Sequence, residues 1–182
     1  GRIDLASGTW HVEQRPDLYH ALRAVLPQMP NIEGAVVDAG RLLLFQRGSG
    51  GAPSAIVMLP IDVLYGEPPH IIDARTVQLG ALDGVALAFT DAALLGPDRI
   101  AFVASAEDAP DAIADGPVAG SVIGVLEHGQ RTARWCRIDG PEAAHAKFEG
   151  LVIAATSAWV LADPDHADQH AQLARLDLQG FG

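Results

Sequence analysis

The sequence contains a single cysteine, Cys136, and this scarcity removes two classes of site. A chain with one thiol forms no internal disulfide and builds no cysteine-based zinc centre. Cys136 lies in the stretch 135–138, which reads as a strand. We therefore interpret it as a small residue in the core or on a sheet face rather than as a catalytic thiol.

Basic residues are also few, with 12 Lys and Arg against 23 Asp and Glu, which gives a net charge of -11. Nucleic acids and anionic membranes both favour a basic surface, so we expect neither as a partner. No run approaches the roughly 18 apolar residues of a membrane-spanning helix. A cationic partner, a metal ion, or solubility alone fits this charge.

The chain has Gly rather than Met at position 1, and residues 2–5 already read as a strand. We expect the natural N-terminus and any signal peptide to lie outside this sequence, so localisation is not assigned.

An internal repeat is the strongest feature that the sequence does have. Three similar apolar segments, 32–37, 89–94 and 148–153, carry acidic residues at Glu33, Asp91 and Glu149, and both intervals are 58 residues. Eight positions after each acid a second apolar strand begins, at 41–45, 99–103 and 157–161. The links between these strands are mostly good turn sequences.

Further strands complete each unit. A third strand is predicted at 55–59, 121–126 and 172–178, and a fourth at 76–79 and 132–138. Four short strands per unit, with nearly continuous apolar inner strands, are typical of a β-propeller blade. We therefore predict an all-β fold made of four-stranded antiparallel blades, with residues 1–182 forming one propeller segment. Its blades are 31–80, 89–139 and 147–178, the last without its outer strand.

The N-terminal residues fit the same scheme. Residues 2–5 resemble 174–178, and 9–13 would then be a fourth strand, so we assign 1–15 to the outer strands of a preceding blade. One short helix is predicted at 17–26 from its apolar spacing, with Pro27 and Pro30 ending it. About three and a half blades cannot close a ring. Further blades or a second chain would have to complete it. A sandwich is the alternative, but it does not explain two equal intervals.

The phrases 31–36, 41–48, 89–93 and 148–151 resemble those of an uncharacterised bacterial propeller family, and they are similar to phytase-like and esterase-like propeller proteins. The resemblance covers most of residues 31–178. It implies a longer parent protein, and for phytase-type propellers it would imply calcium and phosphate esters as ligands.

The repeated acids are the first candidate site. Glu33, Asp91 and Glu149 each begin an inner strand, so they are predicted to point toward one end of a central channel. Carboxylates there could bind Ca²⁺ or Mg²⁺, or place a water for hydrolysis. They could instead cap backbone N–H groups or pair with arginine, and Arg47 beside Glu33 is the expected ion pair.

Two loops extend this candidate site. The long link that contains Glu107 and runs to residue 117 would form either a lid over the channel or a solvated loop. Residues 163–170, beginning with Asp163, are dense in potential ligands but match no known metal motif. The predicted ligand-binding residues are therefore Glu33, Arg47, Asp91, Glu107, Glu149 and Asp163.

The sequence favours a propeller that binds a small molecule or metal ion without catalysis, because no nucleophile–base pair can be identified. A calcium-dependent esterase or phosphoesterase and a protein-interaction scaffold are the alternatives. Calcium is a possible cofactor.

Overall fold

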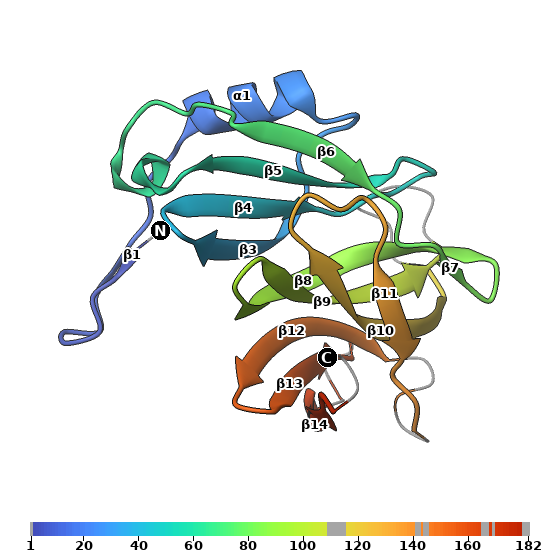
Figure 1. The fold of residues 1–182 in the computed structure, drawn as a ribbon. Coiled ribbons are helices and arrows are strands. Elements are labelled where there is room, and N and C mark those ends of the chain that lie inside the picture. The colour runs from blue at the N-terminus through green and yellow to red at the C-terminus, as the bar shows by residue number, and fades with distance from the viewer. Residues whose placement is uncertain are drawn as a thin grey trace.

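In the computed structural model, antiparallel β-sheets make up most of the regular structure (Figure 1). The structure describes residues 2–108, 116–140, 143, 146–164, 168 and 170–179. Three sheets follow one another along the chain, and we call them sheets 1, 2 and 3. Each strand of these sheets pairs with the strand next to it in sequence.

The strand bounds are as follows. Sheet 1 consists of β3 (Ile32–Asp38), β4 (Arg41–Gln46), β5 (Ser54–Pro60) and β6 (Asp73–Val77). Sheet 2 consists of β7 (Ala81–Leu82), β8 (Val85–Gly96), β9 (Arg99–Glu107), β10 (Val118–Glu127) and β11 (Arg134–Arg137). Sheet 3 consists of β12 (Lys147–Ala154), β13 (Ser157–Asp163) and β14 (Gln172–Asp177).

Three further elements lie outside these sheets. A separate hairpin pairs β1 (Arg2–Ile3) with β2 (Trp10–His11), and it leads into helix α1 (Pro16–Val25). A short 3-10 helix, η1 (Ile61–Tyr65), follows β5. Within the described part of the chain, no helix has the length and apolar character needed to cross a membrane.

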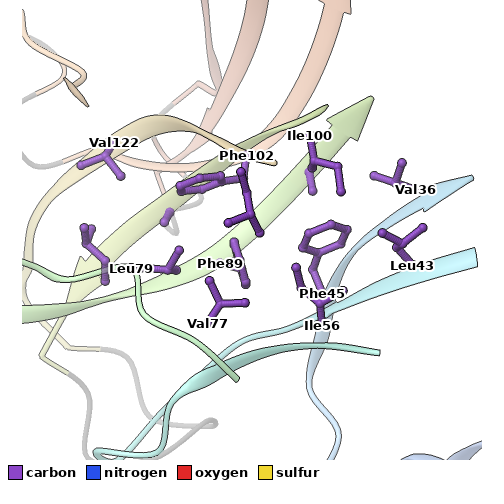
Figure 2. Close-up of a cluster of buried hydrophobic side chains, with 14 of the residues drawn as sticks. Val36, Leu43, Phe45, Ile56, Val77, Leu79, Phe89, Ile100, Phe102 and Val122 are labelled. Carbon is purple, nitrogen blue, oxygen red and sulfur yellow. The ribbon is translucent and has the colours of Figure 1, made fainter. Parts of the chain in front are cut away.

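The sheets stack face to face, and apolar clusters fill the spaces between them. One cluster joins sheets 1 and 2, and its rings Phe45, Phe89 and Phe102 meet edge to face at centroid distances of 5.2 and 5.4 Å (Figure 2). A second cluster joins sheets 2 and 3. These edge-to-face pairs add to the stabilisation that burial of the rings provides.

Helix α1 covers the other face of sheet 1. Leu22 and Leu26 pack there against Leu42, Leu44 and neighbouring residues of β5. The order through the molecule is therefore helix, sheet 1, sheet 2, sheet 3, as Figure 1 shows from top to bottom.

The repeat is visible in the register as well as in the sequence. The first long strand of each sheet has a bulge, at Glu33 and Glu149 near the starts of β3 and β12, and at Thr90 in the middle of β8. The prediction that Asp91 begins its strand is therefore wrong, because β8 already starts at Val85. The turns that follow each place one residue other than glycine at positive φ, namely Ala39, Asp98 and Ala155. β8 has a second irregularity at Leu95, which shifts its pairing by one residue. As a result Asp91 takes the register position of Gly34 and Gly150, not that of Glu33 and Glu149.

The predicted all-β fold with antiparallel sheets is confirmed, and the helix begins and ends one residue earlier than predicted. The predicted strand 76–79 is corrected to Asp73–Val77. Beyond Val77 the chain leaves sheet 1, because Gln78 donates its N–H to Arg131 and Leu79 accepts a hydrogen bond from the Trp135 ring. That the sheets are propeller blades stays a prediction.

Candidate functional site

A row of alternating charges crosses the three sheets at the end where β3 and β12 begin. Glu33 and Arg47 come from sheet 1, Glu107 from the end of β9, and Lys147 and Glu149 from β12. The row is joined by ion pairs between each charged group and the next: Glu33–Arg47 at 3.8 Å, Arg47–Glu107, Glu107–Lys147 at 3.6 Å and Lys147–Glu149 at 2.9 Å. We call these five residues the charge row.

Glu107 is the central member of the charge row. Only 5% of its side chain is exposed. One carboxylate oxygen accepts from Arg47, and the other accepts the Gly116 N–H at 3.0 Å. Burial by itself raises the pKa of Glu107, but the Gly116 N–H, Lys147 and Arg47 outweigh it, so the net pKa is lowered. Glu107 is therefore held as a carboxylate in the folded chain.

The two cations of the row are nearly as buried as Glu107, with 12% of the Arg47 side chain and 10% of the Lys147 side chain exposed. Burial alone lowers the pKa of Lys147, but the bond to Glu149 and the charge of Glu107 reverse this and raise it. Arg47 lies where β4 leaves sheet 1, and its carbonyl accepts hydrogen bonds from Gln28 and Gln46. These contacts fix the backbone that carries the guanidinium.

Asp91 has a different role from the other two repeated acids. Its carboxylate accepts the N–H of Ala92 and, across the sheet boundary, the N–H of Leu151, both at 2.7 Å. Burial raises the pKa of Asp91 more than these two bonds lower it. Gly34 lies against it so closely that an added Cβ would fall 2.9 Å from the Ala92 nitrogen. Asp91 thus joins β8 to β12 and contacts β3.

Buried hydroxyl groups make further links between sheets 2 and 3. Ser105 and Ser121 are hydrogen-bonded at 2.7 Å, and Ser121 also bonds the Ala146 carbonyl and the Phe148 N–H. Thr90 donates to the Phe148 carbonyl. The hydroxyl groups of Ser121 and Thr90 therefore hold the start of β12, which carries Lys147 and Glu149, against sheet 2.

A cleft of about 630 Å³ opens beside the charge row, between sheets 1 and 2. Arg47, Ser105, Glu107, Asp108 and Lys147 form its polar wall. The remaining lining residues all lie in three glycine-containing segments: 48–54, 77–80 and 84–88.

The first of these segments forms a tight loop. An added Cβ at Gly48 would lie 2.4 Å from the Ala52 carbonyl oxygen and 2.7 Å from the Ser54 nitrogen. The Gly48 N–H donates to Ser54, and the Ala52 N–H to the Ser49 carbonyl. Only glycine at position 48 allows the loop to fold back this closely, so the shape of the cleft depends on it.

The predicted site residues fall into two groups. Glu33, Arg47, Glu107 and Glu149 belong to the charge row, and the predicted Glu33–Arg47 pair is present. Asp91 is held by backbone N–H groups, and Asp163 lies at the exposed end of β13, opposite Lys147 in the register. Most of the predicted lid (109–115) and part of the cluster 163–170 lie outside the described residues.

The predicted metal site of Glu33, Asp91 and Glu149 gains no support from this geometry. In the part of the chain that the structure describes, no three His, Cys, Asp or Glu side chains gather in a way that could hold a metal ion. Glu33 pairs with the side chain of Arg47 and Glu149 with that of Lys147, and Asp91 contacts backbone N–H groups.

The sequence predictions did not single out Lys147, Ser105 or the loop 48–54. One signal for Lys147 was available, because it is the only lysine among the 182 residues and it precedes Glu149 by two positions. No local signal marks Ser105, whose place in the cleft follows from the stacking of the sheets.

Comparison with known proteins identifies a family but no activity. No curated protein matches the chain. The sequence profile of a family of unknown function, DUF6929, matches residues 4–178, which is nearly the whole chain. The chain therefore belongs to this family of unknown function, DUF6929.

Proposed function

We propose that the three sheets are neighbouring blades of a β-propeller, and that the chain binds a small polar molecule in the cleft without catalysing a reaction. The repeated order of strands, bulges and turns supports the propeller. So does the packing of β8 against both β3 and β12, since the innermost strands of a propeller meet around its axis.

The observation that carries the binding proposal is the central part of the charge row, Arg47, Glu107 and Lys147, which is buried and forms part of the cleft wall. Buried ion pairs contribute little net stability, because removing the charges from water offsets their attraction. Clefts with a few converging polar groups and shifted pKa values are the usual form of a ligand site. Glu107 and Lys147 both line the cleft, and the pKa of Glu107 is lowered while that of Lys147 is raised.

The lining indicates the class of ligand. Arg47 and Lys147 are balanced by Glu107 and Asp108, so the wall has no net charge. The segments 48–54 and 77–80 add the polar residues Ser49, Ser54 and Gln78 to the lining. This combination suits a molecule that both donates and accepts hydrogen bonds, such as a polyol or a zwitterionic amino acid.

The hydroxyl group of Ser105, in the polar wall of the cleft, supports binding rather than catalysis. Ser105 is hydrogen-bonded to the hydroxyl of Ser121, and a serine that acts as a nucleophile needs a base as its partner.

A thermal-unfolding screen tests this proposal. The chain is heated with polyols, amino acids, sugar phosphates or CaCl₂, and we expect a polyol or amino acid to raise the unfolding temperature. A ligand at roughly 100 times its Kd would stabilise the folded chain by about 2.7 kcal/mol.

A cleft variant and a matched control locate the effect. Ala86 is an exposed residue in the cleft lining, so Ala86→Trp should fill the cleft and abolish the stabilisation. Ala24 is exposed on helix α1, so Ala24→Trp should preserve it. Three results would contradict the proposal: only Ca²⁺ stabilises the chain, no compound stabilises it, or a polyol or amino acid stabilises Ala86→Trp as much as the unchanged chain.

A further inference from the structure

Sheet 3 exposes an apolar face on the side away from sheet 2. Val152 and Leu173 are 61% and 64% exposed, and Trp159 and Leu161 lie between them in the register. The alternate residues of β13, Ala158, Val160 and Ala162, are buried against sheet 2 instead. β13 is thus apolar on both faces, as expected for a strand that is covered on both sides.

The register shows what such a face contacts in the other two sheets. We call the side of a sheet toward the next sheet in chain order its leading face, and the opposite side its receiving face. At equivalent pairing positions, the residues of sheets 1 and 2 are packed against the next sheet, whereas those of sheet 3 are exposed. The equivalent sets are Val36, Leu43, Phe45 and Ile56; Ala93, Ala101, Val103 and Ile123; and Val152, Trp159, Leu161 and Leu173.

The N-terminal hairpin carries the complementary positions. Its residues 2–5 resemble 175–178, and Leu176 and Leu178 pack against sheet 2 from the receiving face of sheet 3. The matching residues of the hairpin, Ile3 and Leu5, are 68% and 93% exposed. Figure 1 shows this hairpin extending away from the sheets. It therefore presents receiving-face residues that its own chain leaves uncovered.

Helix α1 decides which part of a second chain can fit on sheet 3. The receiving face of sheet 1 is covered by α1, so a second copy cannot stack that sheet on sheet 3 without displacing the helix. The hairpin precedes α1 and does not have this obstacle.

We propose that the leading face of sheet 3 binds the N-terminal hairpin of a second copy of this chain. Two copies that exchange hairpins in this way form a closed two-fold dimer, in which each copy both gives a hairpin and receives one. The contact rests on the repeated stacking of the sheets, so it is independent of ligand binding in the cleft.

Sedimentation measured at low and high micromolar concentrations tests the dimer. The unchanged chain should shift from monomer toward dimer as its concentration rises. Trp159→Glu on the face, and Ile3→Glu with Leu5→Glu in the hairpin, should each remain monomeric. Tyr19→Glu changes an exposed aromatic residue on α1 and should dimerise like the unchanged chain.

Mixing the two monomeric variants separates hairpin exchange from other modes of association. The Trp159→Glu chain keeps its hairpin, and the hairpin variant keeps its face, so the mixture retains one of the two contacts. We expect a mixed dimer that is weaker than the unchanged dimer.

Four results would overturn the proposal. They are an unchanged chain that stays monomeric at all concentrations, a Trp159→Glu chain that still dimerises, a hairpin variant that still dimerises, and a mixture without any mixed dimer. Ligand-induced stabilisation, measured on the monomeric variants, reports separately on the cleft.

Discussion

At the scale of single residues, Glu107 has the greatest influence on the site. It receives hydrogen bonds from Arg47 and from the Gly116 backbone, and Lys147 lies 3.6 Å from it. These contacts join all three sheets at one carboxylate. Because they are buried, removing the charge of Glu107 leaves two cations without their shared partner.

Glu107→Gln keeps the size of the side chain and should lower the free energy of unfolding at neutral pH by about 3 kcal/mol, the cost of breaking a buried ion pair. The lowered pKa of Glu107 also sets a pH dependence. Its contribution is complete above the unfolded-state pKa, about 4.3, and is lost as the pH falls through the folded-state pKa. Urea unfolding of both chains, measured from neutral to acidic pH, would show the loss of stability at neutral pH and its dependence on pH.

Glu127→Gln is the control, because Glu127 is an exposed carboxylate at the end of β10 in the same sheet. If the two variants lower the free energy of unfolding equally at neutral pH, the buried contacts of Glu107 do not contribute more to stability than an exposed carboxylate does.

At the scale of elements, the sequence predicted the strands well because their apolar runs and turn residues are local signals. It did not predict the register of β8. The turns after β3 and β8 are 58 residues apart, and so are Glu33 and Asp91. The irregularity at Leu95 shifts the pairing between Asp91 and the turn by one residue, but this shift cannot be detected in the spacing along the sequence. Equal spacing therefore placed Asp91 with Glu33 and Glu149, whereas the pairing places Thr90 there.

Helix α1 was predicted from its apolar spacing, but its role as the cover of sheet 1 was not. Leu22 is 1% exposed and packs within the cluster that joins the helix to β4 and β5. Leu22→Ala should lower the free energy of unfolding by about 3 kcal/mol, the typical cost of such a cavity. Tyr19→Ala, at an exposed position of the same helix, should change it by less than about 0.5 kcal/mol. A small effect of Leu22→Ala would mean that α1 does not cover sheet 1 in solution.

At the scale of the whole molecule, stacking brings together residues that the sequence separates. Arg47, Glu107 and Lys147 lie on three different sheets, and spacing along the chain gives no information on which side chains meet between sheets. The repeat led to the prediction that Glu33, Asp91 and Glu149 lie at one end, with Arg47 beside Glu33, and the long link of the second unit added Glu107. The cleft beside them depends on the loop 48–54, which folds back on itself at Gly48, and on residues 77–80, whose position comes from hydrogen bonds to Arg131 and Trp135.

The central claim is that the cleft between sheets 1 and 2 binds a small polar molecule. An amide NMR titration of the chain with polyols and amino acids tests it most directly, because it shows where a ligand binds as well as whether it binds. We predict shifts concentrated in the segments 48–54, 77–80 and 84–88 and at Glu107 and Asp108. No shifts with any compound, or shifts concentrated away from the cleft lining, would contradict the claim.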